Sequence, residues 1–222
     1  MRPAVEQSHP TPAELIAPDA TLDVLAQAVQ RCRGCDLWRD ATRAVFGEGP
    51  SRALVVMVGE QPGDVEDRRG RPFVGPAGIL LRSCLAEAGI EESDVWLTNV
   101  VKHFKWQPKG KRRIHRTPAA AEIAACRPWL DAELARIRPE IVVCLGATAA
   151  HTLLGRDFKV SVDRGRLLDS PLGTALATVH PSSILRAPDP KSGEEARAAF
   201  VADLGVVAAH LAKHHSAQRR SG

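Results

Sequence analysis

A short basic run, KGKRRIHRTP, occupies Lys109 to Pro118 and contains one histidine, His115. The wider stretch from Lys102 to Arg116 contains no Asp or Glu. Such a concentration of lysine and arginine favours a polyanionic partner, although a solvated basic loop would have the same composition. His115 is then either a phosphate-contacting residue or a reactive base.

Carboxylates and glycines follow an apolar segment in GEQPGDVED, which begins at Gly59. Gly59 permits a tight turn, and Glu60 and Asp64 are candidates for a general base or for electrostatic stabilisation. A solvated acidic turn would give the same pattern. The segment lacks the Lys-Ser/Thr ending of a phosphate-binding P-loop.

Two further residues suit a flat, polar ligand. Phe73 lies among glycines and prolines in GRPFVGPAG, where an aromatic ring either stacks on a ligand or fills the core. Asn99 ends an apolar segment, and its amide offers one donor and one acceptor group. This pair matches the edge of an imide such as uracil.

The cysteines indicate a metal site more than a disulfide framework. Their number is 5, which is odd. Cys32 and Cys35 form a CRGC spacing that can place two thiolates on one metal. Cys84 is expected in a helix and Cys144 in a buried strand, where cysteine usually serves as a small hydrophobic residue.

Apolar strands and helices alternate along the chain. Strands are expected near 53–58, 94–101, 140–147 and 174–179, and helices near 22–31, 76–88, 117–136, 148–154 and 192–213. Ser192 and Glu195 have the spacing of a capping box for the last helix. The alternation predicts an α/β fold of three layers, α/β/α, with a mainly parallel four-stranded sheet. In such a fold the polar segments after the strands converge on one crevice.

The length of 222 residues suits a single domain, expected over residues 22–215. Residues 1–21 and 216–222 are expected to be disordered. The sequence has no apolar stretch typical of a signal peptide or a membrane span. These features favour a monomeric cytoplasmic protein with no membrane partner.

Five motifs occur in a characteristic order: GEQPGDVEDRRGRPFVGPAG, LTNVVKHF, CRPWL, LGATAA and VHPSSILR. Together they resemble the uracil-DNA glycosylase superfamily, near its family-4, iron–sulfur branch. The resemblance covers about Cys32 to Arg186. The KRRIH string is similar to the UdgX-type branch, whose members excise uracil and become covalently joined to the DNA through the loop histidine.

This resemblance implies the fold and a role for each matching residue. Glu60, Gln61 and Asp64 would lie on the catalytic side, and Arg113 and His115 would come from the KRRIH loop. His180 would also be catalytic, by bonding a uracil carbonyl in the transition state. The substrate-binding residues would be Gly59, Phe73, Asn99 and Ser182. The implied partner is uracil-containing DNA in a bacterial nucleoid, with single strands expected first and double strands left open.

The resemblance also implies a 4Fe–4S cluster, with one departure from the family. Family-4 enzymes use four cysteines, whereas this chain matches the pattern with Cys32, Cys35 and Cys126 and has His103 at the remaining position. A histidine ligand is chemically allowed. Cys144 is the competing fourth ligand, and zinc is the runner-up metal because a Cys₃His set is common for zinc.

The same family context makes His115 a candidate nucleophile. The cations around it would favour the neutral imidazole, and Glu60 would orient the ring and accept its proton. One alternative is a conventional glycosylase that turns over with no stable covalent product. The others are a non-enzymatic, metal-bearing nucleic-acid-binding module and a flavodoxin-like nucleotide-binding protein.

Overall fold

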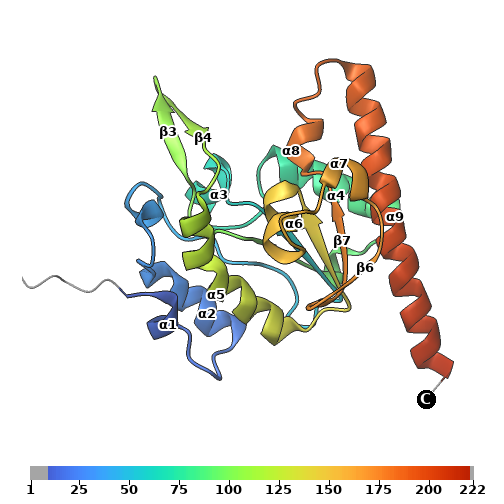
Figure 1. Cartoon of the computed structure of the whole chain (residues 1–222), viewed down its shortest axis with the longest axis horizontal. Coiled ribbons are helices and arrows are strands. Elements are labelled where there is room, and N and C mark those ends of the chain that lie inside the picture. Colours follow the sequence, from blue (N-terminus) through green and yellow to red (C-terminus); the bar gives the residue numbers. More distant parts are fainter. Residues whose placement is uncertain (1–9, 221–222) are drawn as a thin grey trace, which may run out of the picture.

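The computed structural model describes residues 10–220, with side chains to residue 213. Its main sheet has five strands in the order β2-β1-β5-β7-β6, and β3 and β4 form a separate hairpin (Figure 1). The strands are β1 Val55–Gly59, β2 Val95–Asn99, β3 Trp106–Lys109, β4 Arg112–His115, β5 Ile141–Leu145, β6 Leu168–Ser170 and β7 Gly173–Thr178.

Helices cover both faces of the main sheet. The α-helices are α1 Pro12–Leu15, α2 Leu22–Ala28, α3 Asp64–Arg69, α4 Pro76–Ala88, α5 Ala120–Ile137, α6 Ala147–Leu153, α7 Val160–Asp163, α8 Pro181–Ile184 and α9 Pro190–Arg220. Short 3₁₀ helices occupy Val29–Arg31, Asp36–Arg39 and Glu92–Asp94. Among the described residues, no helix is long and apolar enough to cross a membrane.

The alternation of side chains along each strand separates two cores. Val56 and Val142 pack against α2, α5 and α6, whereas Val55 and Val143 pack against α4 and α9. Figure 1 shows α2 and α5 on one side of the sheet and α4 and α9 on the other. The predicted three-layer fold with a mainly parallel sheet is therefore confirmed.

The fifth strand, β6, was not expected. It spans only Leu168–Ser170 and pairs antiparallel with β7, at the edge of an otherwise parallel sheet. The strand has only three residues, and none of them is buried. It therefore lacks the apolar run that would indicate a strand in the sequence.

The chain ends differ from the expected boundaries. Helix α1 lies within the segment expected to be disordered, and Arg136 of α5 binds the carbonyl oxygen of Ala20 at 2.7 Å. Residues 1–9 lie outside the described part of the chain. The last helix begins at Pro190 and continues to Arg220, so it also passes the expected boundary at 215.

The predicted capping box of this helix is wrong. The Asp189 carboxylate accepts hydrogen bonds from the backbone N–H and the hydroxyl of Ser192, at 2.9 and 2.6 Å. Asp189 therefore caps the helix, because an aspartate just before the first turn satisfies the free N–H groups there.

Candidate active site

The carboxyl ends of the parallel strands surround a cavity of about 790 Å³. This is the edge where ligands bind in open α/β sheets. Most of the predicted site residues line it. They are Glu60, Gln61, Asp64, Phe73, Asn99, His115, His180 and Ser182.

Phe73 and Asn99 form one wall of the cavity. The rings of Phe73 and His180 stack with centroids 6.1 Å apart and an angle of 27° between their planes. Gly59 lies beneath them, where an added Cβ would come within 2.4 Å of the Asn99 amide oxygen and 2.8 Å of the Phe73 ring. Gly59, predicted as a substrate-binding residue, does not line the cavity. The structure shows a spatial role instead, because only glycine lets both side chains approach this closely.

Phe73 is both a core residue and a cavity residue. The two roles considered from the sequence, filling the core and facing a ligand, are therefore compatible. Its side chain is buried in the core beside α4 and also faces the cavity. Its backbone has φ of 53°, which is uncommon for a residue with a Cβ. Arg82 donates a hydrogen bond to the Phe73 carbonyl at 2.6 Å and so helps to hold this turn.

His180 is positioned as a neutral hydrogen-bond donor. The backbone N–H of Ser182 donates to His180 Nδ1 at 3.2 Å, so that nitrogen carries no proton. The other nitrogen, Nε2, then carries the hydrogen. Burial, together with Arg186 and His115, lowers the pKa of His180 to about 4. The ring is therefore neutral at physiological pH.

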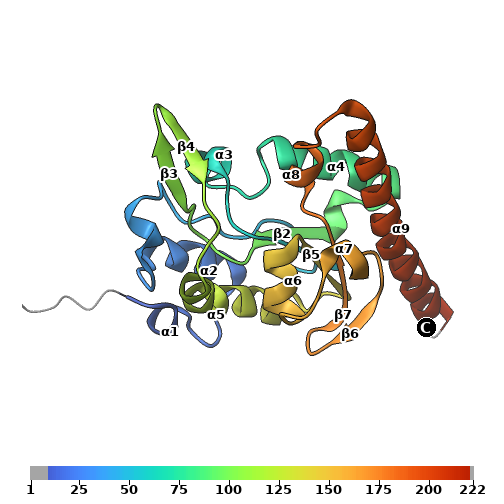
Figure 2. The same ribbon diagram turned by 45° about the horizontal axis from the view of Figure 1, so that its top comes forward.

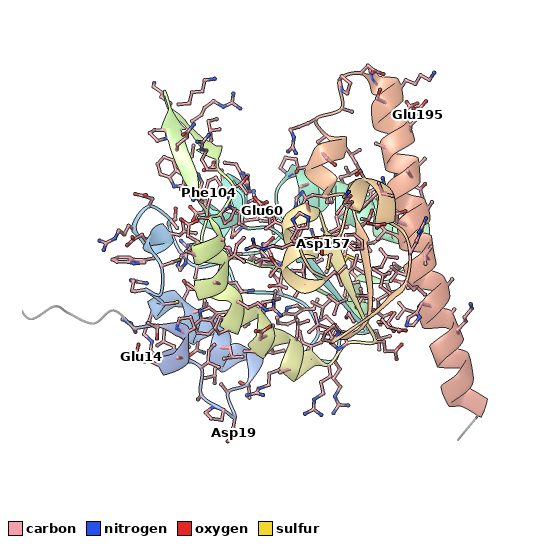
Figure 3. The ribbon with its side chains drawn as sticks, viewed as in Figure 1. Glu14, Asp19, Glu60, Phe104, Asp157 and Glu195 are labelled. Atoms are coloured by element: carbon pink, nitrogen blue, oxygen red, sulfur yellow. The ribbon has the colours of Figure 1, made fainter. Side chains whose placement is uncertain are left out.

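His115 and Glu60 lie next to each other in the lining of the cavity. His115 Nε2 lies 3.4 Å from Glu60 Oε1, and the imidazole stays partly accessible. Figure 3 shows Glu60 between the foot of the hairpin and α6. Burial and nearby Arg186 lower the pKa of His115, whereas Glu60 raises it. The expected direction is found, but burial is the main cause, not the cations of the run.

The basic run forms an antiparallel hairpin, where the sequence suggested only a loop (Figure 2). Strands β3 and β4 pair Trp106 with His115 and Lys109 with Arg112. Gly110 turns the chain with φ of 57°. His115 therefore stands at the foot of a two-stranded arm, next to the body of the protein.

Gln61 joins the two ends of this hairpin. Its amide nitrogen donates to the carbonyl oxygens of Lys105 and Arg116, both at 3.1 Å, and its oxygen accepts from the Lys105 N–H at 3.0 Å. The side chain is buried. Gln61 therefore fixes the foot of the hairpin from the strand end that also supplies Glu60.

Arg113 anchors the hairpin to α3 and does not line the cavity. Its guanidinium binds the carboxylates of Asp64 and Asp67, the latter at 2.7 Å. Asp67 is fully buried and also accepts hydrogen bonds from Thr42. Because all of these charges are satisfied, the contact ties one face of β4 firmly to the body of the protein.

The positive charge of the basic stretch is smaller at the surface than its sequence suggests. Lys102 is fully buried against Glu133 at 2.6 Å, and Lys105 pairs with Glu122 at 2.8 Å. Arg113 is paired as described above. The exposed cations that remain for a polyanion are Lys109, Lys111, Arg112 and Arg116.

The expected metal ligands lie around a second, very small cavity. Cys32, Cys35, His103 and Cys126 line it, together with Trp129, and its volume is about 10 Å³. Cys144 is not among its lining residues and lies buried within β5. Among the side chains that the structure describes, those of residues 10–213, no group of three or more His, Cys, Asp or Glu is arranged to hold a metal ion.

Some details of this cavity suit a thiolate site. Trp129 Nε1 donates to Cys32 Sγ at 3.3 Å, and the Lys102 N–H donates to Cys126 Sγ at 3.2 Å. Burial lowers the pKa of His103 to about 4, so the ring is neutral and can act as a ligand. Burial also raises the pKa of the Cys126 thiol to about 12, a trend that a bound cation reverses.

Comparison with known proteins identifies the family. Residues 46–205 match the model of the uracil DNA glycosylase superfamily. The chain belongs to the uracil-DNA glycosylase superfamily.

Relatives of this chain include proteins with the name type-4 uracil-DNA glycosylase. The Thermotoga maritima protein is 40% identical over 167 residues, which cover 74% of this chain and 83% of the relative. The Archaeoglobus fulgidus protein is 36% identical over 176 residues, covering 76% and 85%. A type-5 uracil-DNA glycosylase of Pyrobaculum aerophilum is 28% identical over 173 residues, covering 70% and 73%.

The structure also brings residues to this glycosylase-type site that sequence reasoning missed. Thr148 and Arg186 line the cavity, and Glu66 holds the Phe73 turn through a 2.7 Å hydrogen bond from the Gly75 N–H. Thr148 lies just after the carboxyl end of β5. Because sites in open α/β sheets form at the carboxyl ends of the strands, this position could have been predicted. Glu133, which pairs with buried Lys102 and does not line the cavity, lies in the middle of α5 and has no such signal.

Proposed function

We propose that this protein excises uracil from DNA and then becomes covalently linked to the abasic sugar through His115. Membership in the uracil-DNA glycosylase superfamily supports the excision. The observation that carries the covalent step is the pairing of His115 with Glu60 in the lining of the main cavity. The substrate is expected to be single-stranded DNA first, since a stacked base must otherwise be flipped out.

Excision requires stabilisation of the departing base. In this proposal Phe73 stacks on uracil, Asn99 reads its imide edge, and the N–H of neutral His180 donates to a uracil carbonyl. As the glycosidic bond breaks, its electron pair leaves with uracil. A fixed donor that faces the developing negative charge lowers the barrier of this step.

The covalent step then follows at the sugar. The lone pair of one His115 ring nitrogen forms a bond to C1′, and the proton on the other nitrogen passes to Glu60. The imidazole is a poor leaving group from this carbon, so the adduct persists. Arg113 and Gln61 position the hairpin so that the ring stays in the lining of the cavity.

A turnover glycosylase is the second candidate, and the type-4 names of the relatives favour it. Incubation with a uracil-containing oligonucleotide followed by denaturing electrophoresis separates the two functions. Covalent capture gives a protein–DNA band that withstands heat and detergent, with an equal amount of uracil released. Turnover gives free uracil without this band. Absence of uracil release would contradict both functions and favour a non-enzymatic nucleic-acid-binding module.

A 4Fe–4S cluster bound by Cys32, Cys35, His103 and Cys126 is the proposed cofactor, with zinc as the alternative. Three cysteines and a neutral histidine are suitable donor types for such a group, and all four side chains line the same small cavity. The N–H groups aimed at two of the sulfurs favour thiolates. A bound cluster would join the segment before the sheet to α5 and to the end of β2.

Removing the proposed histidine ligand is expected to remove most of the iron. Iron and sulfide analysis of purified protein should give a full cluster in the wild type and a strong loss in His103→Ala. His103→Cys should retain the cluster, because it restores a four-cysteine set. Cys144→Ala is the matched control and should contain as much iron and sulfide as the wild type. Zinc in place of iron, or cluster loss only in Cys144→Ala, would contradict this assignment.

Binding to DNA is expected to depend on salt through the exposed cations of the hairpin. A plot of log affinity against log salt concentration should have a negative slope, which Arg112→Ala reduces by about one unit. Arg52 is an equally exposed control that precedes β1, at the opposite edge of the sheet. Arg52→Ala should leave the slope unchanged. A wild-type plot without a slope would contradict binding of DNA through these exposed cations.

A further inference from the structure

The two carboxylate oxygens of Glu60 have different partners. Oε1 lies 3.4 Å from His115 Nε2, and Oε2 accepts a hydrogen bond from the hydroxyl of Thr148. His115 and Thr148 both line the same cavity as Glu60. We infer that Thr148 is a positioning residue: its hydroxyl orients Glu60 toward His115 and so directs the reaction to covalent capture instead of hydrolysis. This inference rests on the proposed function.

Thr148 is itself held in place by its neighbours. It lies in the first turn of α6, and the hydroxyl of Thr152 donates to its carbonyl oxygen at 2.7 Å. The turn before it is fixed by the Gly146 N–H, which donates to the Thr178 carbonyl at 2.9 Å. The hydroxyl that reaches Glu60 therefore comes from a rigid part of the fold.

The start of α6 supports both sides of the site. Gly146 has φ of 92°, and a Cβ added to it would lie 3.0 Å from the Cβ of His180. One short segment thus packs against the histidine that faces the departing uracil and binds the glutamate that faces the nucleophile. This arrangement can hold the two reacting sides at a fixed separation.

The hydroxyl of threonine has one hydrogen to donate, and Glu60 takes it on a single oxygen. The second oxygen is thereby left to the imidazole of His115. Without this bond the carboxylate is free to rotate away from the ring. The imidazole proton then lacks an acceptor at the moment of attack, although cleavage of the glycosidic bond still proceeds.

Water competes for C1′ under these conditions. In capture, the glycosidic C1′–N1 bond breaks, a C1′–N bond to His115 forms, and the imidazole proton goes to Glu60. In hydrolysis, the same C1′–N1 bond breaks, a C1′–O bond to water forms, and the water proton goes to solvent. The ratio of adduct to released uracil therefore reports directly on the orientation of Glu60.

Thr148→Val is expected to lower this ratio by about 10-fold or more, the usual size of a hydrogen bond to a charged group. Quantitative electrophoresis of the adduct and chromatography of the released uracil, from the same incubation, give the ratio. Because both products come from active molecules, the ratio does not depend on how much of the protein is folded. Thr148→Ser keeps the hydroxyl and should restore the wild-type ratio.

Thr174→Val is the matched control. It makes the same substitution near the amino end of β7, at the opposite edge of the sheet from the cavity, and Thr174 is not one of the residues that line the cavity. Its ratio should equal that of the wild type. Thr148→Ala gives a second test without a branched side chain and should behave as Thr148→Val does.

Three outcomes would overturn the inference. They are a wild-type ratio in Thr148→Val, a failure of Thr148→Ser to restore it, and a loss of uracil release in both the Val and Ala variants. The last would place Thr148 in bond cleavage and not in the choice of acceptor. A wild-type protein that forms no adduct at all would instead refute the proposed function.

Discussion

Replacing His115 with alanine or serine is expected to abolish the heat- and detergent-stable protein–DNA adduct. Neither variant has the ring nitrogen that bonds to C1′, so the covalent bond to the sugar cannot form. Glu60 and His180 remain, and uracil release is expected to continue with water as the acceptor. Denaturing electrophoresis, with assay of free uracil, measures both results.

Lys111→Ala is the control for a nonspecific effect of the basic run. Lys111 is an exposed cation in the turn of the hairpin, away from Glu60, and its removal should weaken DNA binding without preventing capture. Peptide mapping of the wild-type adduct should locate the sugar on His115. A stable adduct in His115→Ala, or one mapped to a lysine, would refute the assignment.

The pH dependence of capture follows from the same residue. Attack requires the neutral ring, and burial lowers the pKa of His115 from its usual value of about 6.5. The rate of adduct formation should therefore hold to below pH 6.5 and fall only in more acidic solution, where the imidazole takes up a proton.

Glu133→Gln is expected to destabilise the fold by about 3–5 kcal/mol, because it leaves a buried lysine without its counter-charge. Lys102 and Glu133 are both fully buried and lie 2.6 Å apart. Glu133 also accepts hydrogen bonds from the Gly47 N–H and from Thr98. Denaturant titration followed by circular dichroism measures the free energy of unfolding.

Two comparison variants separate charge from packing. Lys102→Met combined with Glu133→Gln removes both charges and should recover most of the lost stability. Glu122→Gln makes the same change on the same helix, where the pair with Lys105 is only partly buried, and should cost about 1 kcal/mol or less. A similar cost for Glu122→Gln and Glu133→Gln would contradict the role of burial.

The sequence alone determined the elements with strong local signals. Pro76 and Gly89 bound a helix that occupies Pro76–Ala88, because proline suits the first turn and glycine adopts the left-handed cap, here with φ of 75°. Apolar runs gave the four longer strands of the main sheet. The parallel topology then placed the ends of these strands at one edge, so the convergence of Glu60, Asn99 and His180 was predictable.

Local signals failed where they were short or ambiguous. Strand β6 has too few residues to show a pattern. The charged KGKRRIHRTP segment has no alternation of apolar residues, so the sequence predicts a loop where the structure has a hairpin strand. Ser192 and Asp189 are both acceptable caps, and only the geometry of the turn decides for Asp189.

The tertiary structure alone decided which charges of the basic stretch reach solvent and which groups orient the site. Lys102 is buried by Glu133 from the middle of α5, and Arg113 is bound by Asp64 and Asp67. Thr148 reaches Glu60 from 88 positions away in the chain. A sequence shows the type of each side chain, but partners this distant are set only when the helices pack against the sheet. Burial, which lowers the pKa of His115 and His180, likewise arises only in the folded protein.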